Sequence, residues 1–276
     1  MSRLLLCTDL DRTLIPNGNQ PESPGARDVF SHLMERDGVK LTYVSGRHRA
    51  LIEQAIQEYH LPIPDFAIAD VGSTIYRIIE GKWQHWQQWD DEITGDWKGM
   101  SAEALHSLLS DIALLQLQEQ EKQNRHKLSY YLPLGHNHQP IISDIDARLK
   151  AENVRANLIW SVDELKHIGL LDILPASANK LHAIRFLMQH EGYDDKHTVF
   201  AGDSGNDLDV LLSPVQSVLV ANADDEVRAA VKAAAPENLY VARGDFLNMN
   251  GNYSAGILEG IAHYRPGFYS LIKSLQ

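Results

Sequence analysis

The sequence predicts an α/β fold in which a Rossmann-like, doubly wound and mostly parallel sheet forms the core and an α+β cap domain is inserted into it. Near both ends of the chain, short apolar runs bounded by polar residues alternate with segments of helical periodicity. Such runs are typical of parallel strands that are buried on both faces. In the middle of the chain helices and strands follow a different order, which indicates the insert.

The first apolar run, Leu4 to Cys7, leads into residues 9–13, DLDRT in one-letter code. Asp9 and Asp11 are therefore expected at the carboxyl end of a buried strand. Ligands of open α/β sheets bind at that edge of the sheet. The position of the two carboxylates suits a reaction centre.

Two further strands are expected to bring polar residues to the same edge. Residues 39–44 read as a strand, and Ser45-Gly46-Arg47 follows it. Residues 198–201 read as another strand, followed by residues 202–207, GDSGND, which contain Asp203 and Asp207. Because parallel strands end at one edge, we expect these segments to meet.

Lys180 is predicted to begin a helix. Leu181, Ile184 and Leu187 share one face of it, and Ser177 or Asn179 can cap its first turn. The amino end of a helix carries partial positive charge. Lys180 and this helix end would both attract an anion.

The insert is expected to contain two helices and two strands. Residues 102 to about 120 and the region around 142–149 have helical spacing, whereas residues 126–132 and 157–162 read as strands. The strand at residues 170–175 is expected to return the chain to the core. The predicted domains are therefore a core, residues 1–82 and 170–276, and a cap, residues 83–169.

Composition excludes several classes of protein. The 276 residues are 44% apolar, which is enough for one large domain or two smaller ones. The single cysteine, Cys7, excludes an internal disulfide, and the net charge of -12 argues against nucleic acid as a partner. The chain has no apolar run long enough to span a membrane, and Met1-Ser2-Arg3 leads straight into a strand without a signal peptide. We expect a cytoplasmic protein without membrane or nucleic-acid partners.

Each motif alone is weak, because Gly, Asn, Asp and Ser are also common in turns. Together, and each after its own strand, the motifs indicate magnesium-dependent phosphoryl transfer. An ionised carboxylate can attack phosphorus without prior deprotonation. Magnesium prefers oxygen ligands, which the aspartates supply.

These motifs, in this order, resemble the haloacid dehalogenase superfamily of phosphatases, in particular those with an α+β cap (Cof-like, class IIB). The resemblance implies that Asp9 is a nucleophile forming an aspartyl phosphate, that Asp11 is the general acid and base, and that Lys180 pairs with Asp9 and phosphate. It implies a Mg²⁺ ion bound by Asp9, Asp11, Asp203 and Asp207, Asp11 through its backbone carbonyl. The implied phosphate- or substrate-binding residues are Thr13, Ser45, Gly46, Arg47, Lys127 and Asn206. Arg47 is assigned to the substrate side, and a solvent-facing Lys127 is the alternative to substrate contact.

Within the superfamily the chain most resembles the sucrose-phosphate phosphatases. The resemblance rests on residues 71–76, the tryptophan-bearing stretch 83–97, residues 127–130, residues 202–207 and above all the segment 254–264, SAGILEGIAHY. The chain departs from that group at Thr74, where the group tends to have glutamate, and at residues 168–171, where the group has polar residues.

The resemblance implies a phosphatase of a small sugar phosphate, with sucrose 6-phosphate as the first expectation. Because of the departures, phosphates of mannosylfructose, glucosylglycerol and glycosyl-phosphoglycerate remain alternatives. A sugar phosphomutase and an inert sugar-phosphate-binding domain are two further classes, and the intact catalytic set argues against the second. A cognate glycosyltransferase or synthase is a candidate partner.

Overall fold

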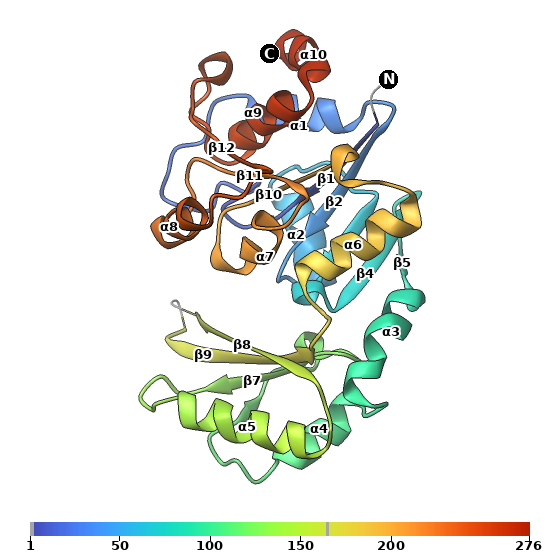
Figure 1. Ribbon diagram of the computed structural model, residues 1–276, viewed down its shortest axis with the longest axis vertical. Helices are drawn as coiled ribbons and strands as arrows, with labels where there is room; N and C mark the ends of the chain where they lie inside the picture. The colour runs from blue at the N-terminus through green and yellow to red at the C-terminus, as the bar shows by residue number, and fades with distance from the viewer. Residues whose placement is uncertain (1–2, 164–165) are drawn as a thin grey trace.

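The computed structural model describes residues 3–163 and 166–276. It contains an eight-stranded sheet and a four-stranded sheet, which lie in separate layers (Figure 1). Met1 and Ser2, at the start of the segment from which the absence of a signal peptide is predicted, lie outside the described residues. In the described part of the chain, no helix has the length and apolar character needed to cross a membrane.

The larger sheet has the strand order β12-β11-β10-β1-β2-β3-β4-β5. Its strands are β1 (Leu4–Thr8), β2 (Val39–Val44), β3 (Phe66–Ala69), β4 (Thr74–Ile79), β5 (Lys82–His85), β10 (Thr198–Gly202), β11 (Gln216–Leu219) and β12 (Leu239–Val241). Only the pairs β3/β4 and β4/β5 are antiparallel; the others are parallel. The predicted fold class, an α/β fold with a mostly parallel sheet and an α+β cap, is confirmed.

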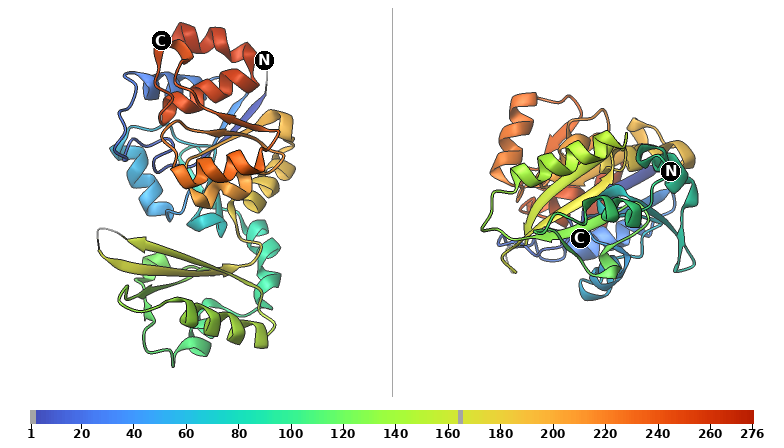
Figure 2. Two further views of the ribbon diagram at one scale, coloured as in Figure 1. Left: turned by 60° about the vertical axis from the view of Figure 1, so that its left-hand side comes forward. Right: turned by 90° about the horizontal axis from the view of Figure 1, so that it is seen from below.

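Helices cover both faces of this sheet (Figure 2). One face packs against α1 (Ala26–Met34), α2 (Arg49–Glu58), α9 (Ser254–Tyr264) and α10 (Tyr269–Leu275). The other packs against α3 (Gln87–Ile93), α6 (Lys180–Glu191), α7 (Leu208–Leu211) and α8 (Asp225–Ala234). Strand β1 alternates between the two clusters, with Leu4 and Leu6 in the first and Leu5 and Cys7 in the second. This double burial explains the continuous apolar run from which the strand is predicted.

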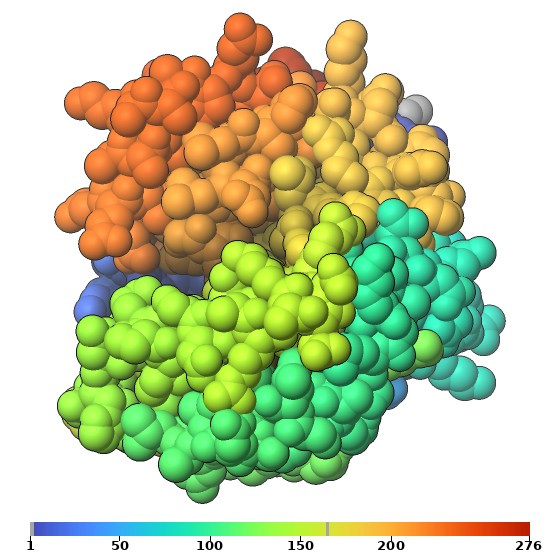
Figure 3. Space-filling model, turned by 60° about the horizontal axis from the view of Figure 1, so that its bottom comes forward, coloured from blue at the N-terminus to red at the C-terminus, as the bar shows by residue number. Residues whose placement is uncertain are grey.

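The smaller sheet is antiparallel throughout, with the order β6-β7-β9-β8. Its strands are β6 (Gln116–Leu117), β7 (Leu128–Leu132), β8 (Ala156–Asp163) and β9 (Ile168–Pro175), and it packs against α4 (Ala102–Leu109) and α5 (Gln139–Ala151). We call this sheet with its two helices the cap, and the larger sheet with its helices the core. In the space-filling view the cap forms a lobe that meets the core along a furrow (Figure 3).

Three predicted elements of the insert differ from the structure. The helix expected to reach about residue 120 ends at Leu109, because residues 116–117 form an edge strand whose backbone pairs with β7. The strand expected from residue 126 begins at Leu128, because Asn124 and Lys127 exchange backbone hydrogen bonds in a turn. The strand that is expected to rejoin the core, β9, instead lies between β7 and β8 in the cap sheet. The exact domain boundaries remain a prediction.

Helix α9 is the segment 254–264 singled out in the sequence, and it is buried from Ser254 to Ala262. A Cβ atom at Gly256 would lie 2.2 Å from the carbonyl oxygen of Gly251, so only glycine lets the two backbones approach this closely. Buried Glu259 accepts hydrogen bonds from the Tyr240 hydroxyl and from the backbone N–H groups of Arg243 and Gly244. Helix α9 thereby fixes the end of β12 and the chain that follows it.

Candidate active site

The three strands predicted to deliver polar residues, β1, β2 and β10, are neighbours in the sheet and run parallel. The segments that follow them meet at their carboxyl ends, where the backbone N–H of Asp9 bonds to the carbonyl of Ala201 at 2.9 Å. Asp9 is 5% exposed and Asp203 is 1% exposed. The site is therefore built from buried carboxylates held by a rigid sheet.

Lys180 lies at the centre of these carboxylates. Its ammonium group donates hydrogen bonds to Asp9 Oδ1 at 2.9 Å, Asp207 Oδ1 at 2.7 Å and Asn206 Oδ1 at 2.9 Å. All three protons of the group are used. Burial alone would lower the pKa of Lys180, but the Asp207 and Asp9 carboxylates raise it above its ordinary value. Lys180 is a fixed cation.

Helix α6 places Lys180, as predicted, and Asn179 caps it by accepting a hydrogen bond from the backbone N–H of His182 at 2.8 Å. Gly72, with φ +98°, packs against the backbone of Asn179, where a Cβ atom would lie 2.6 Å from the Asn179 carbonyl carbon. The left-handed backbone and the close approach both require glycine. The turn after β3 and the start of α6 thus hold one another in place.

Asp9, Asp203 and Asp207 form a cluster in which one oxygen of each lies within 4.8 Å of the others. Burial raises the pKa of Asp9, with Asp207 and Asp203 adding to this rise and Lys180 opposing it. Burial and the Asp207 carboxylate raise the pKa of Asp203 to about 6. Three buried carboxylates beside one ammonium group leave negative charge that a further cation would neutralise.

The donor set fits a divalent cation. Asp203 Oδ1 accepts a hydrogen bond from Thr13 at 3.0 Å, whereas buried Asp203 Oδ2 accepts none from the described residues. Arg12 Nε lies 3.5 Å from that oxygen. Carboxylate oxygens of this kind suit hard cations such as magnesium or calcium.

Asp11 lies at the mouth of the site and forms a bidentate ion pair with Arg47. Arg47 Nε is 2.8 Å from Asp11 Oδ2 and Arg47 Nη2 is 2.6 Å from Asp11 Oδ1, while Asn17 donates to Oδ1 at 2.7 Å. Burial would raise the pKa of Asp11, but these hydrogen bonds and the Arg47 charge hold it below its ordinary value. Arg47 thus contacts Asp11 in this structure.

Ser45 and Gly46 form the turn after β2. The Ser45 backbone N–H bonds to the Ile68 carbonyl at 2.8 Å, and its hydroxyl accepts from the Arg47 N–H at 3.2 Å. Ser45 and Gly46 line a pocket of about 370 Å³ together with Asp9, Asp11, Asp203 and Asn206. The turn can offer its hydroxyl and backbone amide to an anion bound at Asp9.

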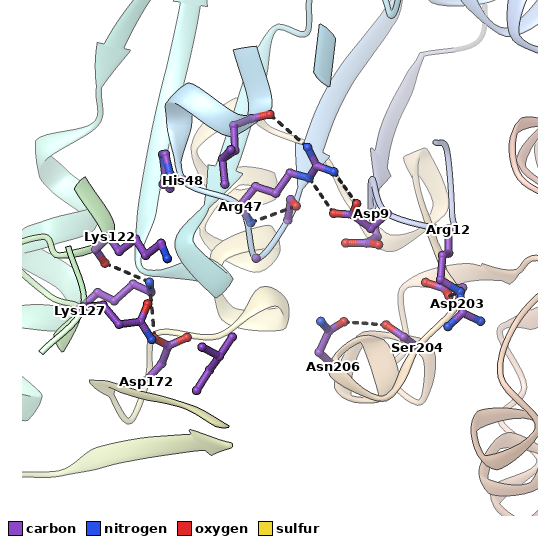
Figure 4. Close-up of a pocket in the computed structure, with 16 residues that line it drawn as sticks. Asp9, Arg12, Arg47, His48, Lys122, Lys127, Asp172, Asp203, Ser204 and Asn206 are labelled. Atoms are coloured by element: carbon purple, nitrogen blue, oxygen red, sulfur yellow. Dashed lines mark hydrogen bonds and ion pairs between the residues drawn. The ribbon is translucent and has the colours of Figure 1, made fainter. Parts of the chain in front are cut away.

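The opposite wall of this pocket comes from the cap. Figure 4 shows Lys122, Lys127 and Asp172 facing the group of Asp9, Asp203, Ser204 and Asn206 across the pocket. Lys127 is only 7% exposed, and its ammonium group lies 3.5 Å from Asp172 Oδ1. The alternative of a solvent-facing Lys127 is wrong, and this lysine lines the pocket.

Several pocket residues were not among the predicted site residues. They are Arg12, His48, Leu51, Gln118, Lys122, Leu170, Asp172 and Ser204. Arg12 and Ser204 lie inside the two motifs and could have been proposed from them. Gln118, Leu170 and Asp172 are brought to the pocket by the pairing of β7 with β6 and β9, for which the sequence carries no local signal.

The chain is similar to several known proteins. The family model described as sucrose-6F-phosphate phosphohydrolase matches residues 2–265. A Nitrosococcus oceani protein described as a HAD-like hydrolase is 56% identical over 96% of this chain and 72% of its own length. Sucrose-phosphatase 1 of Nicotiana tabacum is 28% identical over 96% of this chain, which spans 60% of the tobacco protein.

Two other similarities cover nearly all of both chains. Mannosylfructose-phosphate phosphatase of Agrobacterium fabrum is 27% identical over 94% of this chain and 96% of its own. The crystal structure of the sucrose-phosphatase from Synechocystis sp., in complex with sucrose and phosphate, superposes with a TM-score of 0.72 at 27% identity. It covers 96% of this chain and 98% of that one.

The carboxylate cluster predicts how stability responds to pH and to a divalent cation. A folded-state pKa near 6 for Asp203, above the ordinary 3.8, means that its ionised form is disfavoured in the folded protein. In chelator, the contribution of Asp203 to stability should fall as the pH rises from about 4 to about 6, so Asp203→Asn should raise the melting temperature at pH 7.5. Millimolar Mg²⁺ should raise the melting temperature of the wild type by roughly 5 °C and that of the variant by far less.

Thermal unfolding with chelator and with Mg²⁺ measures both effects. Asp65→Asn is the matched control, because Asp65 precedes β3 at the opposite edge of the sheet and pairs with Lys40. Its response to the cation should equal that of the wild type. A cation response that survives in Asp203→Asn would place the cation elsewhere.

Proposed function

Because the chain belongs to the sucrose-6F-phosphate phosphohydrolase family of haloacid dehalogenase-like phosphatases, we propose that it hydrolyses a small sugar phosphate, sucrose 6-phosphate first among them. The reaction would need Mg²⁺ and would pass through an aspartyl phosphate on Asp9. One observation carries this proposal: Asp9, which is paired with Lys180, lies at one end of a pocket whose other wall is the cap's Lys122, Lys127 and Asp172. The phosphate would bind at the core end and the sugar at the cap end.

In the first step Asp9 is the nucleophile. Its free carboxylate oxygen forms a bond to phosphorus while the bond from phosphorus to the sugar oxygen breaks, which leaves phosphate on Asp9. Lys180 holds the other oxygen, Oδ1, at 2.9 Å and so orients the attack. Asp11, protonated at this stage, gives its proton to the departing sugar oxygen.

In the second step Asp11 takes a proton from water, and the water oxygen attacks phosphorus. The bond between phosphorus and Asp9 breaks, which releases inorganic phosphate and restores both aspartates. One residue can serve as acid and then as base because it returns to its starting state in each cycle.

Positive charge lets one anion attack another. Bound Mg²⁺ would supply part of this charge, held by Asp9, Asp203 and Asp207 and by the Asp11 carbonyl. The Ser45 hydroxyl, the Gly46 amide and the Asn206 side chain would hold phosphate oxygens. Lys180 would attract the phosphate by its charge while its protons hold Asp9, Asn206 and Asp207, and Thr13 would orient Asp203. The core, the larger sheet with its helices, would perform this chemistry for any phosphate ester, and it corresponds to the predicted residues 1–82 and 170–276 except that β9 (Ile168–Pro175) lies in the cap sheet.

Asp11 must be freed from Arg47 before it can act as an acid, because the ion pair keeps it ionised. An arriving phosphate or sugar hydroxyl would offer Arg47 a new partner and so release Asp11. We propose that this exchange links substrate binding to protonation of Asp11, which assigns Arg47 to the substrate side of the site.

The charges at the cap end favour an uncharged sugar. Lys127 lies between Asp172 and Asp70, and Lys122 lies 3.1 Å from Glu119. Paired charges of this kind can bind hydroxyl groups, which both donate and accept hydrogen bonds. Sucrose, mannosylfructose and glucosylglycerol phosphates fit this wall better than a glycosyl-phosphoglycerate, whose carboxylate would compete with Asp172.

The departure at residues 168–171 also bears on the substrate. Leu170 is the residue of this stretch that lines the pocket, and a Cβ atom at Gly169 would lie 1.9 Å from the Trp160 ring. The cap therefore presents Leu170 where the related phosphatases have polar side chains, so a close relative of sucrose 6-phosphate remains an alternative.

We place the activity in the cytoplasm, with a glycosyltransferase or synthase as the source of the substrate.

Phosphate release from a panel of sugar phosphates tests the proposed activity. With Mg²⁺, kcat/KM should be highest for sucrose 6-phosphate or for the phosphates of mannosylfructose or glucosylglycerol. Glycosyl-phosphoglycerate should be poorer, and p-nitrophenyl phosphate poorer still. Preferred turnover of the glycerate would overturn the charge argument, and transfer of phosphate between sugar hydroxyls without free phosphate would indicate a mutase.

The pairing of Arg47 with Asp11 predicts a change in pH dependence. Arg47→Ala removes the guanidinium charge beside Asp11. The pKa of Asp11 should then rise, because in the wild type Arg47 holds it below its ordinary value. The limb of the kcat/KM profile that reports Asp11 should therefore move to higher pH by about one unit, since this profile reports groups of the free enzyme.

Arg49→Ala is the control for this profile, because Arg49 lies two residues after Arg47, at the start of α2, and pairs with Glu53. Its profile should match that of the wild type. An unshifted profile in Arg47→Ala would show that the ion pair does not set the protonation of Asp11.

A further inference from the structure

The turn after β3, η1 (Asp70–Gly72), has an unusual backbone. Asp70, Val71 and Gly72 have consecutive positive φ values of 53°, 60° and 98°. A β-branched residue such as Val71 is rarely found in this region. Such strain persists only where the surroundings enforce it, and it is concentrated at functional sites. Neither Asp70 nor Val71 has a place in the mechanism above.

The backbone of this turn holds residues 45–47, which we call the phosphate-binding loop because they would bind the phosphate in the proposed function. The Asp70 N–H donates to the Arg47 carbonyl at 3.0 Å, and the Val71 N–H donates to the Ser45 carbonyl at 3.1 Å. Each bond comes from a residue in the left-handed region. The strained turn therefore holds the backbone of residues 45–47 in position after the end of β2.

The side chain of Asp70 points the other way, toward the cap. This carboxylate is 5% exposed. Its Oδ2 accepts a hydrogen bond from the Thr74 hydroxyl at 3.3 Å, and its Oδ1 lies 4.0 Å from Lys127 Nζ. Burial raises the pKa of Asp70, and the Lys127 charge opposes that rise.

Asn124 adds a second link between the core and the cap at this point. Its side-chain amide lies 3.3 Å from the Ser73 hydroxyl and 3.2 Å from the Thr74 hydroxyl. Asn124 and Lys127 close the turn before β7 by exchanging backbone hydrogen bonds. The cap turn that carries Lys127 is therefore docked onto the residues around Asp70.

The Lys127 ammonium lies between two carboxylates that come from different parts of the fold. Asp172, on cap strand β9, is 3.5 Å away, and Asp70 of the core is 4.0 Å away. Lys127 also donates to the Lys122 carbonyl at 3.1 Å, which leaves two protons for other partners. Asp70 is not a lining residue of the pocket, so its carboxylate would act on a substrate through Lys127 and not by direct contact.

We propose that Asp70 is a positioning residue that sets the distance between the phosphate-binding loop and Lys127. Its backbone holds the loop and its carboxylate holds the cap lysine, so one residue joins both ends of the pocket. Asp70 then determines selectivity for esters whose leaving group reaches the cap. This inference rests on the proposed function.

Asp70→Asn tests the carboxylate with little risk to folding, because asparagine tolerates the left-handed region and can still accept from Thr74. For the best sugar phosphate of the panel, KM should rise about tenfold with kcat within about twofold, as for a contact made equally in the ground and transition states. For p-nitrophenyl phosphate, whose small leaving group is not expected to reach Lys127, KM should change less than about twofold. A general structural defect would affect both substrates alike.

A rescue variant and a matched control sharpen this test. In Asp70→Ala combined with Thr74→Glu, a carboxylate from position 74 can occupy the space near Lys127, because the Thr74 hydroxyl is 3.3 Å from the Asp70 carboxylate. It should recover at least part of the KM for the sugar phosphate that Asp70→Ala alone loses. Asp65→Asn, at the other end of the same strand β3, should leave the ratio of the two KM values unchanged. Equal KM changes for both substrates, or none, would overturn the proposal.

Hydrogen exchange without substrate keeps this inference separable from the proposed function. In Asp70→Asn the amides of residues 120–127 should exchange faster than in the wild type, whereas those of α5 (Gln139–Ala151) should not change. If no sugar phosphate is hydrolysed but the exchange changes as expected, the substrate assignment fails and the positioning role stands. Unchanged exchange in residues 120–127 would overturn the positioning role whatever the substrate.

Discussion

The site depends on one interaction, the contact of the buried Lys180 ammonium with the carboxylates of Asp9 and Asp207. Burying ions is costly unless each is paired and hydrogen-bonded. The structure meets this condition because all three ammonium protons are donated, to the carboxylate oxygens of Asp9 and Asp207 and to the side-chain amide oxygen of Asn206. This one cation does not balance the three carboxylates of the cluster. The remaining negative charge suits a divalent cation, as proposed, and a phosphate could bind only once that charge is offset.

In the proposed function the core and the cap divide recognition between them. The core end of the pocket carries groups that suit a phosphate, held on the ends of rigid parallel strands. The cap end carries paired lysines and carboxylates, on a small antiparallel sheet whose strands come from residues 116–175. A sugar phosphate bound as proposed would contact both ends, so the distance between them would matter as much as the identity of the side chains. The contacts of Asp70 with Arg47, Thr74 and Lys127 lie where that distance is set.

The sequence was sufficient for the parts of the site that follow from local pattern. Asp9, Ser45 and Asp203 each come directly after a buried apolar strand, and parallel strands end at one edge, so their convergence could be predicted. The start of α6 at Lys180 could also be predicted, from its cap and its apolar face. Three other positions could not be predicted. That of Gln118 depends on strand register in the cap, that of Asp172 on the placement of β9 in the cap sheet, and that of Asp70 on a strained turn. Lys127 could be identified as a candidate but not placed, since its burial depends on two carboxylates distant in sequence.

The most direct test of the account is to identify the residue that carries phosphate during turnover. Rapid acid quenching of the Mg²⁺-loaded enzyme with its best sugar phosphate, followed by borohydride reduction, converts a phosphorylated aspartate into homoserine that peptide mass spectrometry can locate. The account predicts homoserine at Asp9, none at Asp11 or Asp203, and none in Asp9→Asn. Homoserine at another aspartate, or rapid turnover by Asp9→Asn, would contradict the assignment of Asp9 as the nucleophile.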